Sequence, residues 1–210
     1  MTKLMLIRHG ETDWNREEVF RGQIDVELNS KGLRQAWLLA KYLRNEPLSA
    51  VYSSPLRRAQ RTAEIVASYH SIKIEKSIQL TDMNYGVWQG LPKDKVIEQY
   101  SGLYKQWLKN PHLVQVPGGE TLEDVKSRAY KLILQITGDF SDTVAVVSHR
   151  VVIKVLICTL LGLDISHFCN VKLGTCGITT FTYEDGLHIL TKHNATSFLK
   201  HLGTTKENDF

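Results

Sequence analysis

The segment Lys3-Leu4-Met5-Leu6-Ile7-Arg8-His9-Gly10 decides the fold. Its apolar run, residues 3–7, lacks polar alternation, so it predicts a strand that is buried on both faces of a sheet. Residues 143–147 form a second run of this kind, which ends in Ser148-His149-Arg150. Parallel strands of one sheet end at the same edge, where ligands bind in open α/β sheets. The two runs therefore predict that His9 and His149 meet at this edge.

Around these runs, short β-branched segments alternate with helical periods, which is typical of the α/β class. Apolar spacing predicts one helix with Ser30 as N-cap and Trp37 on its apolar face, a second opened by Ser54-Pro55, and a third over residues 122–136. Residues 50–53 predict a short strand, and residues 178–183 and 188–191 predict a closing hairpin. Residues 92–111 are polar and aromatic, and they predict a short helical insertion that covers the sheet edge.

Length and composition bound the organisation of the chain. Its 210 residues, 42% hydrophobic and 23% charged, support one globular domain. We expect a single domain over residues 1–203, with a cap insertion at about 92–117 and a flexible C-terminal tail at 204–210. The net charge of +4 is too small and dispersed to indicate nucleic acid, but it suits small anionic ligands. No apolar run reaches the ~20 residues of a membrane helix, so no membrane partner is expected.

The cysteines bear on compartment and on metal binding. There are three, Cys158, Cys169 and Cys176, an odd number in a chain that is too long to need disulfides. Their spacings match no zinc pattern. They predict a reducing cytoplasm, no bound metal, and thiols that are buried as small hydrophobic groups.

Arginines accompany the histidine-bearing segments. Arg8 precedes His9, and Arg57, Arg58 and Arg61 lie near the start of the helix after the 50–53 strand. Guanidinium groups match phosphoryl oxygens, and a helix N-terminus adds to the attraction for anions. The pattern predicts an anion pocket. A lone histidine after a strand is more often structural, however, and Arg57 and Arg61 fit a solvated helix face better than a site.

Several segments, in chain order, resemble the motifs of the histidine phosphatase superfamily, the phosphoglycerate mutase-like enzymes. They are Arg8-His9-Gly10-Glu11-Thr12 with Trp14-Asn15, Ser53-Ser54-Pro55-Leu56-Arg57-Arg58-Ala59 with Thr62-Ala63, Leu80-Thr81-Asp82 with Gly86, Trp88 and Gly90, Pro117-Gly118-Gly119-Glu120, and Val146-Val147-Ser148-His149. The resemblance extends over nearly the whole chain. It implies a three-layer α/β/α sandwich with a mixed, mostly parallel central sheet and a small helical cap.

The resemblance also implies roles for single residues. His9 would attack phosphorus and become a phosphohistidine. Arg8, Arg58 and His149 would surround the phosphoryl oxygens. Further substrate or phosphate contacts would come from Asn15, Arg21 and Gly22. No metal ion or cofactor is implied.

Three positions leave alternatives open. Asp82 stands where the family usually has a glutamate that serves as general acid, and its alternative is a loop-capping aspartate. Glu11 and Glu120 are the competing carboxylates, and Glu11 fits a positional role. Arg21 either contacts an acidic substrate or is an exposed loop arginine. Arg150 replaces the glycine that commonly follows the second histidine, and it either narrows the pocket or contacts a charged substrate.

These residues favour a metal-independent, cytoplasmic phosphatase that acts on a small phosphorylated metabolite through a phosphohistidine. α-Ribazole phosphate, phosphoserine and sugar or glycerate phosphates are the candidate substrates. A phosphoglycerate mutase-type phosphotransferase and a non-catalytic phosphate-binding module are the alternatives. The aromatic residues Tyr100, Tyr104 and Trp107 of the cap could stack on a substrate ring, but their near-helical spacing fits packing better. A homodimer is left open.

Overall fold

The computed structural model describes residues 1–202 of the chain, and its strands form one sheet in the order β3-β2-β4-β1-β5-β6. The strands are β1 (Thr2–Arg8), β2 (Leu48–Ser53), β3 (Ile74–Lys76), β4 (Thr143–Ser148), β5 (Ile178–Glu184) and β6 (Leu187–Ala195). The first four run parallel, whereas β5 pairs antiparallel with β1 and with β6. The predicted mixed, mostly parallel sheet and its closing hairpin are therefore confirmed.

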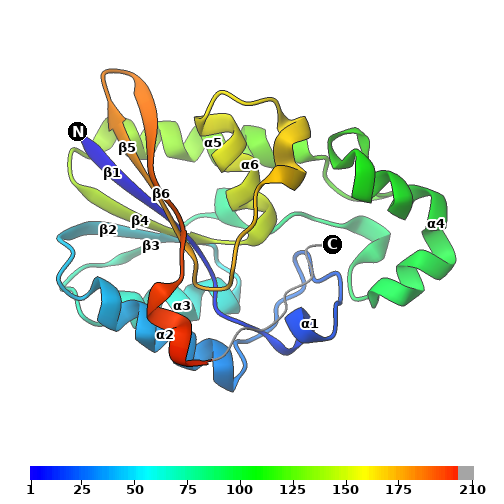
Figure 1. Cartoon of the computed structure of the whole chain (residues 1–210), viewed down its shortest axis with the longest axis horizontal. Helices are drawn as coiled ribbons and strands as arrows, with labels where there is room; N and C mark the ends of the chain where they lie inside the picture. Colours follow the sequence, from blue (N-terminus) through cyan, green and yellow to red (C-terminus); the bar gives the residue numbers. More distant parts are fainter. Residues whose placement is uncertain (203–210) are drawn as a thin grey trace.

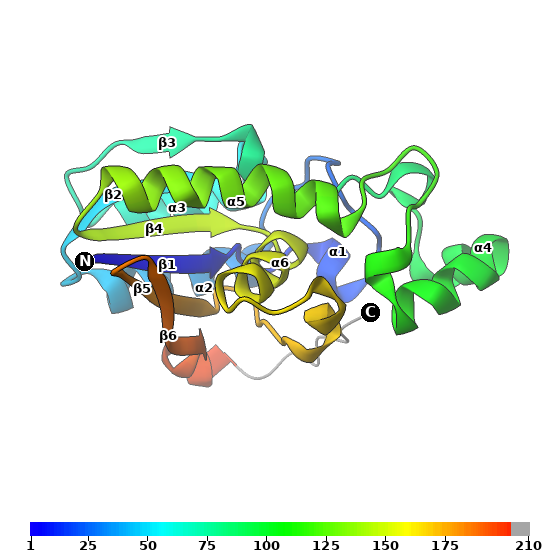
Figure 2. The same cartoon turned by 90° about the horizontal axis from the view of Figure 1, so that it is seen from above.

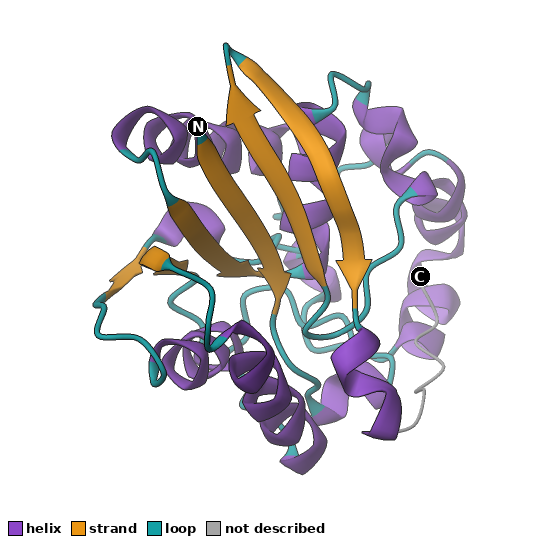
Figure 3. Ribbon diagram, turned by 60° about the vertical axis from the view of Figure 1, so that its left-hand side comes forward, coloured by secondary structure: helices purple, strands orange, loops and turns teal. Residues whose placement is uncertain are grey.

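Helices cover both faces of the sheet (Figure 1, Figure 3). One layer holds α2 (Ser30–Leu43) and α3 (Arg57–Ala67), and the other holds α5 (Leu122–Asp139) and α6 (Arg150–Leu160). Leu4 of β1 belongs to the apolar cluster beneath α5 and α6, and the next residue, Met5, belongs to the cluster beneath α2 and α3. Because successive side chains of a strand point to opposite faces, an unbroken apolar run is required here. This confirms the three-layer sandwich.

The register of β1 and β4 positions the two histidines. Arg8, the last residue of β1, lies opposite Ser148, the last residue of β4. The strands are parallel neighbours, so His9 and His149 leave the sheet side by side at its carboxyl edge. The amide of His9 also donates to the carbonyl of Ser148 at 3.0 Å.

Two predicted helix starts are wrong, one by one residue and the other by two residues. The N-cap of α2 is Asn29, whose side chain accepts from the Gly32 amide, and not Ser30. Trp37, expected on the apolar face of this helix, is 49% exposed. The next helix, α3, begins at Arg57, because Leu56 keeps an extended backbone. The Ser54 hydroxyl, expected to cap it, accepts from the Leu56 amide within the preceding turn.

The cap lies at the carboxyl edge of the sheet, the edge at which both histidines lie. Its helix α4 (Lys93–Lys109), which departs from helical geometry at Tyr100, lies beyond the carboxyl ends of the strands (Figure 2). The edge strands are β3 and β6. Tyr104 and Trp107 are buried, so packing is the correct interpretation of these two aromatic residues.

Short elements complete the described part of the chain. They are α1 (Asp13–Arg16) and the 3-10 turns η1 (Ile78–Leu80), η2 (Gly86–Trp88), η3 (Pro111–Leu113), η4 (Ile165–Asn170) and η5 (Ser197–Leu202). Cys158 and Cys176 are buried as predicted, but Cys169 is exposed on η4. The predicted tail, residues 204–210, lies outside the described residues. Within residues 1–202, no helix combines the length and the apolar character that a membrane crossing requires.

Candidate active site

The first histidine of the pair, His9, is held in one tautomer. Its ring is fully buried, and Nδ1 lies 2.6 Å from the carbonyl oxygen of Gly10. A carbonyl oxygen only accepts hydrogen bonds, so Nδ1 carries the proton. Nε2 therefore bears a lone pair, and no hydrogen-bond partner reaches it among the described residues. This nitrogen is available as a nucleophile.

The second histidine, His149, lies against the first, with a distance of 5.2 Å between the ring centroids. Its Nε2 lies 2.8 Å from the hydroxyl oxygen of Ser54, and its Nδ1 lies 3.6 Å from Oδ2 of Asp82. The Ser54 hydroxyl also accepts from the Leu56 amide, so its own hydrogen can be donated to Nε2 of His149. That arrangement puts a proton on Nδ1, facing Asp82.

Both imidazoles are neutral at physiological pH. Burial, followed by the neighbouring ring of His149 and the charges of Arg58, Arg21 and Arg8, lowers the pKa of His9 well below 6.5. The pKa of His149 is lowered in the same way, first by burial and then by Arg58. A protonated imidazole has no lone pair at the reacting nitrogen, so these surroundings keep His9 in its nucleophilic form.

The arginine of the second motif, Arg58, is fully buried and fixed at three points. Its guanidinium donates to the carbonyl oxygens of Gly22 at 2.7 Å and Ile24 at 3.0 Å, and to Oδ2 of Asp82 at 3.1 Å. Burial lowers the pKa of Arg58, and the Asp82 carboxylate opposes that shift. By contrast, Arg57 and Arg61 are exposed and form ion pairs with surface carboxylates, as the solvated-face interpretation predicts.

Two further arginines line the same cleft. Arg8 is buried and donates to the carbonyl oxygen of Leu173 at 2.6 Å. Arg21 is half-buried and donates to the Thr12 hydroxyl at 3.0 Å. Burial and the charge of Arg58 lower the pKa of Arg21 to about 9, so it is still cationic at neutral pH. Arg21 is thus part of the cleft and not an exposed loop residue.

Asn15 and Gly22, the other predicted contacts, also line the cleft. Oδ1 of Asn15 accepts from the Thr12 amide at 2.9 Å, which fixes its side chain at the start of α1. Gly22 has a φ of +51°, and a Cβ there would collide with the Gln89 side chain. Its carbonyl oxygen accepts from Arg58, so Gly22 acts on the site through that arginine.

Of the three candidate carboxylates, the structure brings Asp82 to the histidine pair. Its Oδ2 contacts Arg58 and faces His149, and its Oδ1 accepts from the Met83 amide. Glu120 instead pairs with Arg128 at 2.7 Å. Glu11 pairs with Lys31 at 3.3 Å and accepts from Asn29 at 3.1 Å, which is a positional role in the loop.

The sequence interpretation missed three residues that support the site. Ser54 orients His149, Arg128 donates to the main-chain carbonyl of Asp82 at 3.2 Å, and Tyr85 forms part of the cleft wall. Ser54 had a signal, since it belongs to the quoted Ser53-to-Ala59 motif. Arg128 and Tyr85 had none, because their contacts depend on how distant segments meet.

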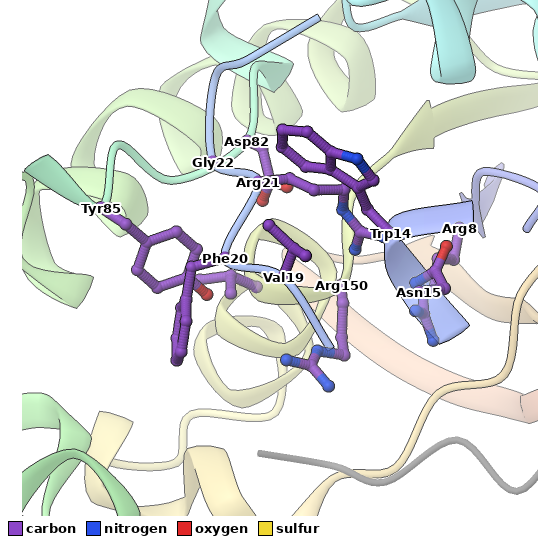
Figure 4. Close-up of a pocket in the computed structure, with 11 residues that line it drawn as sticks. Arg8, Trp14, Asn15, Val19, Phe20, Arg21, Gly22, Asp82, Tyr85 and Arg150 are labelled. Atoms are coloured by element: carbon purple, nitrogen blue, oxygen red, sulfur yellow. The ribbon is translucent and has the colours of Figure 1, made fainter. Parts of the chain in front are cut away.

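A cleft leads to this cluster (Figure 4). It is lined by Arg8, Trp14, Asn15, Val19, Phe20, Arg21, Gly22, Asp82, Tyr85, Arg150 and Val151. The rings of His9 and His149 are fully buried and do not reach the cleft surface. Residues 1–202 contain no group of three His, Cys, Asp or Glu side chains placed to hold a metal ion.

Several known proteins are similar to this chain over nearly its whole length. Phosphoserine phosphatase 1 of Hydrogenobacter thermophilus is 33% identical over 200 residues, which cover 95% of each chain. The structure of YhfR from Bacillus stearothermophilus has a TM-score of 0.92 at 30% identity, covering 95% of this chain and 100% of that one. A phosphoserine phosphatase mutant of Entamoeba histolytica, solved with phosphoserine, has a TM-score of 0.85 at 30% identity and the same coverage.

The family model agrees as well. The model of the histidine phosphatase superfamily (branch 1) matches residues 4–196, which span both histidines, Arg58 and Asp82. The match covers far more than half of the chain. The chain belongs to branch 1 of the histidine phosphatase superfamily.

Proposed function

We propose that this protein hydrolyses a small phosphomonoester in two steps, with His9 as the nucleophile. One observation carries the proposal: the unprotonated Nε2 of His9 lies among Arg8, Arg21 and Arg58. A neutral nitrogen and a ring of fixed cations are what in-line attack on a phosphoryl group requires. The phosphatase names of the relatives support the same reaction.

In the first step, the lone pair of His9 Nε2 forms a bond to phosphorus as the bond from phosphorus to the ester oxygen breaks. Protonated Asp82 gives its proton to that leaving oxygen, which departs as an alcohol. The guanidinium groups and Nδ1–H of His149 stabilise the charge that develops on the three other phosphoryl oxygens. The products of this step are phosphohistidine and the carboxylate of Asp82.

In the second step, the Asp82 carboxylate takes a proton from water. The water oxygen forms a bond to phosphorus, and the bond between phosphorus and Nε2 breaks. Phosphate leaves, while His9 returns to its neutral form and Asp82 is protonated again. The open cleft supplies the route for water and for both products.

Labelling of the enzyme tests the proposal. A brief incubation with ³²P-phosphoserine and an alkaline quench should leave acid-labile, alkali-stable label on the wild type and none on His9→Gln. His167→Gln is the matched control. Because His167 is exposed, this variant should still be labelled on His9. Tight phosphate binding without label would instead indicate a binding module. Transfer of label to glycerate with little free phosphate would indicate a mutase.

A further inference from the structure

The positive charge of the cleft exceeds the negative charge of a phosphoryl group. Its charged lining side chains, among the described residues, are Arg8, Arg21, Arg150 and Asp82. Arg58 lies behind them, bound to Asp82. These four guanidinium groups carry more charge than a phosphate dianion and Asp82 together, so positive charge is left over whether Asp82 is ionised or carries the proton for the leaving group. A substrate with one further negative charge matches this cleft better than a neutral alcohol phosphate.

Of these cations, Arg150 is set apart by its place in the cleft. Arg8, Arg21 and Arg58 surround His9 closely enough to lower its pKa. Arg150 is the first residue of α6, directly after His149, and its guanidinium lies on the side of the cleft away from Asp82 (Figure 4). The position suits a group on the part of the substrate that is not transferred.

Tyr85 supplies a second polar group at this position. Its ring is buried and fixed by edge contacts with Phe20 and Trp107, at centroid distances of 5.2 and 5.6 Å. Burial and the Asp82 charge raise the pKa of Tyr85, while a hydrogen bond with Arg150 opposes the shift. The hydroxyl therefore stays protonated, and a neutral hydroxyl beside a guanidinium can bind a carboxylate by charge-assisted hydrogen bonds.

We propose that Arg150, assisted by the Tyr85 hydroxyl, binds a carboxylate of the substrate. The preferred substrate is then a phosphomonoester with a carboxylate close to the ester, of the phosphoserine or phosphoglycerate type. This proposal rests on the proposed function, because it assigns the specificity of the same cleft. Of the two roles that the sequence leaves open for Arg150, the proposal selects contact with a charged substrate over narrowing of the pocket.

Phosphoserine and phosphoethanolamine form a matched pair of probes, since they differ only in the carboxylate. The quantity to measure is the ratio of kcat/KM for phosphoserine to that for phosphoethanolamine. Loss of a hydrogen bond to a charged group costs about 1.5–3 kcal/mol, so this ratio should fall about 10- to 100-fold in Arg150→Gln. Tyr85→Phe, which keeps the ring, should lower it less. Arg16→Gln, an exposed arginine on α1, should leave the ratio at the wild-type value.

The outcomes separate this proposal from the proposed function. If the wild type turns over both probes equally, or if Arg150→Gln slows both equally, the carboxylate site is wrong even though phosphohistidine forms. If neither probe labels the wild-type enzyme, the proposed function fails and the carboxylate site with it. A lowered ratio that Arg150→Lys partly restores would support a charge-dependent contact.

Discussion

At His9, the hydrogen bond between Nδ1 and the Gly10 carbonyl leaves the reactive lone pair on Nε2. The same logic applies to His149, where the Ser54 hydroxyl meets Nε2 and leaves Nδ1 toward Asp82. In the proposed mechanism, two imidazoles of one chemical type thereby take different roles, one as nucleophile and the other as hydrogen-bond donor. Their immediate neighbours, and not their intrinsic chemistry, make the difference.

Arg58 and Arg57 provide a matched pair of neighbouring arginines. Arg58→Ala should lower kcat by about 100- to 1000-fold, the usual cost of removing one preorganised donor to a developing negative charge. Arg57→Ala should leave kcat within about twofold, because Arg57 is exposed and pairs with Asp25 and Glu27. Steady-state turnover of phosphoserine measures both. Equal effects of the two substitutions on kcat would contradict the assignment of Arg58 to the active site.

The role of Asp82 as general acid can be tested with two esters whose leaving groups differ in their need for a proton. If Asp82 protonates the departing oxygen, Asp82→Asn should slow phosphoserine hydrolysis by about 100- to 10,000-fold. The nitrophenolate of p-nitrophenyl phosphate departs without a proton, so formation of the phosphoenzyme from this ester should slow much less. Rapid-quench labelling with each ester gives the two rates. A loop-capping aspartate would affect both esters alike.

For single residues, the sequence predicts which side chains come together in the site. It predicts less well which hydrogen bonds hold them there. Both histidines end apolar runs, so their meeting follows from the adjacency of two parallel strands. The clamp on Arg58 by the Gly22 and Ile24 carbonyls could not be predicted, since it joins residues more than 30 positions apart through backbone atoms. The orientation of Arg150 likewise depends on the cleft that forms around it.

Among the elements, α4 packs an aromatic side chain against rings of the segment before it and of η4. Trp107 of α4 contacts the rings of Tyr85, Trp88 and Phe168 at centroid distances of 5.6–6.3 Å. Tyr85 in turn lines the cleft. The cap is therefore connected to the cleft through the contact between Trp107 and Tyr85. Trp107 itself does not line the cleft.

Two tryptophans allow this packing to be tested. Trp107→Ala should lower the free energy of unfolding by about 3–5 kcal/mol, because it leaves a cavity in a buried aromatic cluster. Trp37→Ala, at a position that is 49% exposed on α2, should change it by less than about 1 kcal/mol. Urea unfolding followed by circular dichroism measures both. Similar losses in the two variants would contradict the assignment of Trp107 to the core.

Element boundaries show where local sequence signals fail. Ser54-Pro55 reads as a helix start, but the Ser54 hydroxyl is used by His149 and by the Leu56 amide, so α3 begins later. Ser30 and Asn29 are both good capping residues, and only the contact with Gly32 selects Asn29. The place of α4 had no local signal, because it is set by the aromatic contacts of the folded protein.

For the whole molecule, the buried histidines predict acid sensitivity. The pKa values of His9 and His149 are lowered well below 6.5 by burial, so each ring binds fewer protons in the folded state than in the unfolded state below that pH. Their contribution to stability is thus complete above about pH 6.5 and is lost as the pH falls, by about 1 kcal/mol per pH unit for each ring.

Denaturant unfolding at about pH 7.5 and about pH 5.5 measures this loss. The double variant His9→Gln, His149→Gln should lose clearly less stability between these two conditions than the wild type does. His167→Gln should behave like the wild type, because His167 is exposed. An unchanged pH dependence in the double variant would show that other groups cause the acid sensitivity.

The order of the strands also constrains how the chain folds during synthesis. The central strand β1 pairs with β4 and β5, so Leu4 meets Val144 and Phe181, residues made long after it. At roughly 5–20 residues per second, the ribosome needs on the order of 7–30 s to reach β4. During that interval the apolar strand β1 has no partner strand, and a chaperone that binds short apolar segments would find a target in it.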